Sequence, residues 1–248
     1  MSILEQITDR YQRVARLLPG LIVVLPVSVQ VVSSIPLVLN LWGKLGALLV
    51  ASGLPFAVAQ AVRDRGRRLE NELFAAWGGR PTEAMLSWSG SSTKASIRRR
   101  HALIEQHLGI ALPDQAAENN DPDGALAMYE VAVGALRERT RDRAMFPLLF
   151  HELINYGFRR NLLSLRSAGV TLTLLSAIAT VTLSWTGLVP LGWKQQSALV
   201  AFDCLWIAGW LRIVTSEWVR GAAETYARQL LDSLETIGGP ALPAETSQ

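Results

Sequence analysis

The stretch LLPGLIVVLPVSVQVVSSIPLVLNLWG, residues 17–43, contains no charged side chain and lies between Arg16 and Lys44. A helix of about 25 residues reaches about 37 Å, which is enough to cross a hydrocarbon core of about 30 Å. The prolines within it predict kinks rather than a break, because membrane helices tolerate proline. The stretch is also longer than the apolar core of a signal peptide. We therefore expect a retained transmembrane helix.

Three further apolar stretches follow, at residues 45–62, 167–193 and 195–217. Loops of only a few residues separate the members of each pair, so each pair is expected to form an antiparallel hairpin. Half of all residues are hydrophobic, and this excess is concentrated in the two hairpin regions. The predicted fold class is an all-α membrane protein, with four spans in two transmembrane helical hairpins and a cytoplasmic helical domain between them.

Basic residues predict the direction of the spans through the positive-inside rule. Only Lys44 and Lys194 lie at the two hairpin tips. The opposite ends of the spans carry Arg10, Arg13, Arg16, Arg63, Arg65, Arg67, Arg68, Arg159, Arg160, Arg166, Arg212 and Arg220. Both termini and the middle domain are thus expected in the cytoplasm, and a bacterial inner membrane is the expected location. This topology also explains the sequence pI of about 9.3 without a nucleic-acid partner.

The expected domains are an amphipathic helix at 1–16, hairpin 1 at 17–62, a cytoplasmic helical domain at 63–166, hairpin 2 at 167–217, and a stalk helix with a tail at 218–248. The second span is expected to continue as a helix to Gly78-Gly79, and the fourth to continue to Gly238-Gly239. Between them we expect a short helix 83–88, helices 96–108 and 123–139, a loop at 111–123, and a helix after Asp142. Thr82, Asp123 and Asp142 are the expected N-caps.

Signatures of catalysis are missing from the sequence. His101 and His107 are six residues apart and do not share a helix face, and Cys204 is the only cysteine. No zinc motif, phosphate-binding loop or nucleophile elbow occurs. We expect no enzyme activity, no metal and no cofactor.

Asp203 is the most informative residue, because an ionisable group inside a span is costly and normally faces a partner or a cavity. At the same depth the other spans offer polar side chains, and these are Gln30, Ser33, Ser34, Ser52, Thr180 and Thr182. This polar layer has two interpretations. It either joins the helices by hydrogen bonds, or it lines a wet path within one chain or at the centre of an oligomer.

The basic residues of the cytoplasmic part offer a second candidate site. Arginine side chains bind phosphates in a bidentate manner. Such a surface could be supplied by Arg80, Arg98, Arg99, Arg100, Arg159 and Arg160. The alternative for Arg159 and Arg160 is an anchor at the lipid headgroups.

The strings Trp77-Gly78-Gly79-Arg80-Pro81-Thr82 and Tyr156-Gly157-Phe158-Arg159-Arg160-Asn161 resemble those of a group of bacterial multi-pass inner-membrane proteins with no assigned activity. The resemblance covers about residues 75–170. The plan of four spans also resembles the transmembrane effectors of phage defence, which is a likeness of architecture alone.

That likeness implies a non-enzymatic, oligomeric effector in antiviral defence. A cytoplasmic signal, for which an anionic nucleotide is one candidate, would make the spans rearrange and permeabilise the membrane. A small ion channel or transporter using Asp203 is the alternative, and a scaffold subunit of a membrane complex is the third.

Overall fold

The computed structural model describes residues 10–34, 54–187 and 191–237, and these residues form helices and turns without a strand. The expected all-α class is therefore confirmed. Two expected features, the second span up to residue 53 and the first hairpin tip, fall outside the described residues. The same holds for most of the N-terminal amphipathic helix and for the tail after Ile237.

The helices form two compact units. The described residues of 1–73 and 154–220 make up the first, which we call the span unit. Residues 74–153 and the described residues from Gly221 onward make up the second, which we call the α8 unit. The chain passes between the units three times, within α4 (Leu54–Trp77), α9 (Pro147–Ser164) and α12 (Ser216–Ile237).

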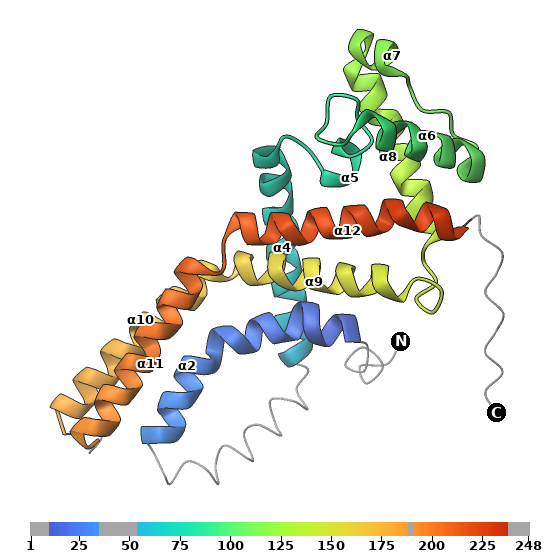
Figure 1. The fold of residues 1–248 in the computed structure, drawn as a ribbon. Helices are drawn as coiled ribbons and strands as arrows, with labels where there is room; N and C mark the ends of the chain where they lie inside the picture. The colour runs from blue at the N-terminus through green and yellow to red at the C-terminus, as the bar shows by residue number, and fades with distance from the viewer. Residues whose placement is uncertain (1–9, 35–53, 188–190, 238–248) are drawn as a thin grey trace, which may run out of the picture. The chain divides into compact units, whose positions relative to one another are not determined.

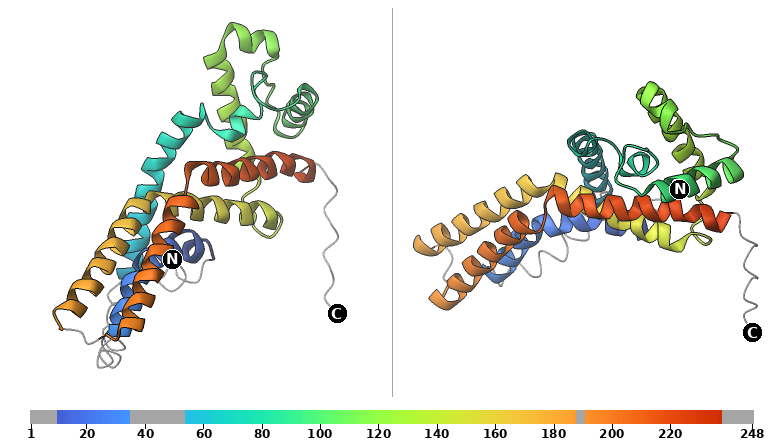
Figure 2. Two further views of the ribbon diagram at one scale, coloured as in Figure 1. Left: turned by 60° about the vertical axis from the view of Figure 1, so that its left-hand side comes forward. Right: turned by 45° about the horizontal axis from the view of Figure 1, so that its top comes forward.

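Three long helices of the span unit lie side by side in Figures 1 and 2, with α10 (Arg166–Trp185) against both α2 (Leu18–Ser34) and α11 (Trp193–Arg212). A short π-helix, η1 (Gln12–Leu17), leads directly into α2. Among the described residues, Gln12–Val31 and Arg166–Trp185 are each long and apolar enough to cross a membrane. A third candidate is the pair α11 and α12, if the two helices count as one span.

The α11–α12 pair differs from the straight stalk that the sequence suggested. The two helices meet at an angle of 55°. The hydroxyl of Thr215 accepts a hydrogen bond from the backbone N–H of Trp218 at 3.3 Å, so Thr215 caps a new helix. The fourth apolar stretch therefore bends near residue 213 instead of continuing to Ile237 as one rod.

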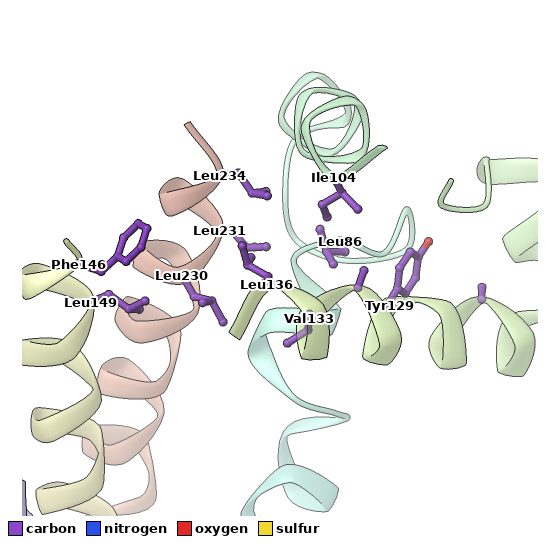
Figure 3. Packing of buried hydrophobic residues seen from close by; sticks show 12 residues of the cluster. Leu86, Ile104, Tyr129, Val133, Leu136, Phe146, Leu149, Leu230, Leu231 and Leu234 are labelled. Carbon is purple, nitrogen blue, oxygen red and sulfur yellow. The ribbon is translucent and has the colours of Figure 1, made fainter. Parts of the chain in front are cut away.

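The α8 unit is built around α8 (Pro122–Arg139), with α5 (Pro81–Ala84), α6 (Lys94–Leu108) and α7 (Gln115–Asn120). Its core, shown in Figure 3, joins Leu86, Ile104, Tyr129 and Leu136 to apolar residues of α9 and α12. From α12 come Leu230, Leu231 and Leu234, which are all buried. The second half of α12 is therefore part of this core rather than a separate stalk, because its buried leucines pack against the apolar residues of α8 and α9.

Several local expectations need correction. Arg80, not Thr82, precedes the short helix α5, which ends at Ala84 rather than Trp88. Asp121 caps α8 in place of Asp123, and the expected loop contains α7 with Asp114 as its cap. Asp114 and Asp121 accept hydrogen bonds from the backbone N–H groups of Ala117 and Gly124 and so set the first turns of α7 and α8. Helix α5 has no side-chain cap and begins at Pro81, a residue suited to the first helical position.

Two further boundaries concern the start of α9 and the end of α4. Asp142 bonds the N–H groups of Ala144 and Met145 in a turn, and α9 begins only at Pro147. The stop of α4 at Gly78-Gly79 is confirmed, with φ angles of 79° and 130° that favour glycine.

Candidate functional site

A buried chain of hydrogen bonds joins the three long helices of the span unit. Gln30 of α2 stands in the middle, and its amide nitrogen donates to Oδ2 of Asp203 on α11. The hydroxyl of Thr180 on α10 donates to the amide oxygen of Gln30. Asp203 is fully buried, and Gln30 and Thr180 are nearly so. We call these three residues the span network.

The span network continues along one face of α10. Thr180 also contacts the carbonyl of Ser176 at 3.2 Å, and Thr173 donates to the carbonyl of Gly169 at 2.8 Å. Thr173, Ser176 and Thr180 are buried and recur at the spacing of one helix face. Polar side chains therefore point inward along this helix, while Leu174, Leu175 and Leu183 are exposed.

Other members of the predicted layer do not join the span network. Thr182 is exposed on α10, because two residues along a helix rotate a side chain to the far face. The side chain of Ser33 does not join it either, and its backbone carbonyl accepts a hydrogen bond from the Gln195 amide at 2.9 Å, outside the span network. The side chain of Ser34 and all of Ser52 lie outside the described residues.

A cavity of about 290 Å³ adjoins the span network between α2 and α10. Its polar lining residues are Gln30, Ser176 and Thr180, and its other lining residues are apolar. The second carboxylate oxygen of Asp203, Oδ1, is buried and has no hydrogen-bond partner among the described residues. The span network is therefore incomplete around its carboxyl group.

A second polar cluster in the span unit contains Glu70, Tyr156, Arg160 and Asn161, and we call it the α9 knot. The Arg160 guanidinium lies 2.8 Å from one Glu70 carboxylate oxygen, and the Tyr156 hydroxyl donates to the other at 2.6 Å. The Asn161 amide donates to the carbonyl of Ala15 in η1 at 2.6 Å. The knot thus ties α9 to both α4 and η1.

Electrostatics in the α9 knot favour the charged ion pair. Burial, together with the charge of Glu70 and its hydrogen bond, raises the pKa of Tyr156, so the phenol stays protonated and donates. Burial opposes the charge on Arg160, but the nearby Glu70 carboxylate outweighs it and raises the pKa of the guanidinium. Gly66 permits this close approach, because a Cβ there would lie 2.0 Å from Oδ1 of Asn161.

The six candidate arginines do not converge on shared partners. In the span unit, Arg160 belongs to the α9 knot, and Arg159 donates to the carbonyl of Trp218 at 3.0 Å while lying over its ring. In the α8 unit, Arg80 pairs with Glu130 and Arg99 with Glu235, at 3.2 and 2.8 Å. Arg100 donates to the Met85 carbonyl and to Ser92 at 3.1 and 3.2 Å. Arg98 is exposed.

Five of the six arginines thus have partners within the protein, and the arginine surface for phosphate stays a prediction. Arg159 and Arg160 hold helices together, and their string Tyr156–Asn161 is explained by packing between helices. Phe158, for example, packs edge-to-face against Trp218. The sequence gives the residue types but not the acidic partners, which come from distant positions.

Sequence reasoning missed a cavity in the α8 unit. It measures about 290 Å³, and Arg80, Glu83, Ser87, Glu118 and Tyr129 are among its lining residues. Glu118 accepts hydrogen bonds from Ser87 Oγ, the Trp88 and Ser89 N–H groups, and the Tyr129 hydroxyl, at 2.6, 2.9, 3.2 and 2.5 Å. Burial alone would raise the pKa of Glu118, but these hydrogen bonds lower it to about 2.

A signal for this cavity existed in the Trp77–Thr82 string, which supplies Gly78, Gly79 and Arg80 to its wall. Glu118 sits in a stretch expected to be a loop, and nothing local marks it as buried. No protein-family model matches the chain, and no curated protein or solved structure does.

Proposed function

We propose that the protein is a non-enzymatic membrane effector, in which the α8 unit receives a signal and the spans respond by permeabilising a bacterial inner membrane. The span network carries the proposal. It joins α2, α10 and α11 through hydrogen bonds that a modest helix movement would break. Breaking it exposes a carboxyl group and an amide within the spans.

The route for the signal is the three helices that run without interruption between the units. In α4, α9 and α12, residues of the α8 core and residues of the span unit belong to the same helix. A change in the packing of Leu149 or Leu230 can therefore be passed along α9 or α12 to the point in the chain where α10 begins or α11 ends. The proposal includes four spans, with residues 45–62 as the second, cytoplasmic termini, and assembly of several copies around the opened spans.

Replacement of Gln30 tests the proposal, since this residue makes both hydrogen bonds of the span network. In cells that express Gln30→Leu, an impermeant dye should enter without any signal, whereas wild-type cells should exclude it. The matched control is Gln195→Leu, because Gln195 also links α11 to α2 but is exposed and lies outside the span network. Equal exclusion by Gln30→Leu and wild type, at equal membrane levels, would contradict the proposal.

A second candidate is a small channel or transporter that uses Asp203. The cavity beside Gln30 and Thr180, together with the unbonded Oδ1 of Asp203, favours it. In that case Asp203→Asn changes the pH dependence or ion selectivity of a basal flux. An effector held closed by hydrogen bonds shows no basal flux, and asparagine keeps it closed.

A further inference from the structure

Two buried carboxylates of the α8 unit line the same cavity and differ in their bonding. Glu118 accepts four hydrogen bonds, as described above. Glu83 is only 2% exposed, yet neither of its carboxylate oxygens has a hydrogen-bond partner among the described residues. Buried polar groups are almost always bonded, so an unbonded carboxylate marks a place where a partner is expected.

The nearest positive group leaves Glu83 uncompensated. One Arg80 nitrogen lies 3.7 Å from the Glu83 carboxylate, which is too long for a hydrogen bond. The same nitrogen is closer to Glu130, at 3.2 Å. Arg80 is also 45% exposed, so water weakens its attraction for Glu83. Glu83 and Glu118 both line the cavity, and Arg80 is the one basic residue among its lining residues, so its wall carries excess negative charge.

We propose that this cavity binds a small organic cation, with a primary ammonium or guanidinium group that donates hydrogen bonds to Glu83. A ligand of this class supplies both the positive charge and the N–H donors that the carboxylate lacks. Leu126 and Pro122 on the wall offer apolar contact for a short carbon chain. A phosphate-bearing ligand is disfavoured here, because two carboxylates would face it.

Burial raises the pKa of Glu83, and the charge of Glu130 adds to the rise. The charges of Arg137 and Arg80 lower it, as does the backbone N–H of Glu83 itself, although this N–H does not form a hydrogen bond with the carboxylate. A bound cation would favour the ionised form. The affinity of the cavity for the cation is therefore expected to increase with pH in the range where Glu83 would otherwise take up a proton.

This site deepens the proposed function, since it would supply the signal input. Binding of the cation can be measured without a leakage assay.

Putrescine is a suitable probe, and butanediol is its neutral analogue with the same carbon chain. The full-length protein in lipid nanodiscs is titrated with each by calorimetry. Wild type is expected to bind putrescine saturably and butanediol not at all. Glu83→Gln is expected to bind putrescine at least about tenfold more weakly, the factor for loss of one charged hydrogen bond. Glu138→Gln should bind as wild type, because Glu138 lies on α8 but is exposed and pairs with Arg141 outside the cavity.

Thermal unfolding without ligand guards against a folding artefact. Glu83→Gln should melt at the wild-type temperature or above it, because glutamine removes a buried unpaired charge. Putrescine should raise the melting temperature of wild type and of Glu138→Gln but not of Glu83→Gln. Absence of saturable putrescine binding, equal binding of butanediol, unchanged affinity in Glu83→Gln, or a lower melting temperature for that variant would each overturn the proposal. None of these results bears on leakage by Gln30→Leu.

Discussion

The α9 knot and the span network are both buried polar clusters of the span unit, but they are built differently. In the α9 knot each oxygen of Glu70 has its own donor, and one of these donors is a guanidinium. In the span network only one oxygen of Asp203 is bonded, and its donor is the neutral amide of Gln30. Charged, hydrogen-bonded pairs are the stronger ones. This difference supports the proposal that the knot keeps its helices together while the spans separate at the network.

The largest expected effect comes from breaking the α9 knot. Arg160→Leu leaves the buried Glu70 carboxylate without its cation, and loss of one partner of a buried pair costs about 3–5 kcal/mol. Thermal unfolding in detergent should show a large drop in melting temperature. Arg98→Leu, at an exposed position, is the control and should melt as wild type. A stable Arg160→Leu variant would mean that Arg160 is free to serve another purpose.

Glu118 extends the comparison to the α8 unit, since it is the most completely bonded carboxylate described here. Its pKa falls from an ordinary value of 4.5 to about 2 in the folded protein. A lowered pKa means that the stabilisation is present above about pH 4.5 and is lost as the pH falls towards about 2. Glu118→Gln should be less stable than wild type at neutral pH, and this difference should shrink across that acidic range. If the difference in stability between Glu118→Gln and wild type stayed constant with pH, the ionised form of Glu118 would not be what stabilises the fold.

Gly66→Ala tests the packing of the α9 knot rather than its charge. The new Cβ would collide with the Asn161 side chain, and overpacking of this kind costs about 1–3 kcal/mol. Gly209→Ala on α11 is the matched control, because a Cβ there meets no atom within 4 Å. Equal melting temperatures for the two variants would contradict the close approach of α4 and α9.

Thr180→Val should have the smallest effect, because it removes one neutral hydrogen bond of the span network without changing side-chain size. The expected loss of stability is about 0.5–1.5 kcal/mol. Thr182→Val, two residues further along the same helix and exposed, should be neutral. The pair is compared by thermal unfolding, and equal losses would show that the inward face of α10 is wrongly assigned.

The span network could be predicted from the sequence, because the depth of a residue within a span follows from its distance along the helix from the hairpin tip. Counting residues from the hairpin tips placed Gln30, Thr180 and Asp203 in one layer, and the structure brings these three into contact. The same counting included Thr182, since depth says nothing about which face a side chain occupies. Helical spacing within α10 separates Thr180 from Thr182.

The α9 knot and the α8-unit cavity could not be predicted from the sequence, because their residues come from separate parts of the chain. Arg160 and Glu70 are far apart in the chain, as are Glu83, Glu118 and Tyr129, and only tertiary packing brings such partners together. The bend at Thr215 was missed because the apolar pattern continues across it. The role of α12 in the α8 core likewise depends on which partner its apolar face meets.

The most direct test of the account separates the charge of Asp203 from its hydrogen bond. Purified wild type, Asp203→Asn and Asp203→Ala are placed in vesicles loaded with a self-quenching dye, and release is followed by fluorescence. Asparagine can still accept from Gln30, so Asp203→Asn vesicles should stay as tight as wild type. Asp203→Ala cannot, and its vesicles should leak without any added signal. Tight vesicles with Asp203→Ala, or equal leakage from both variants, would contradict the claim that the span network holds the membrane helices closed.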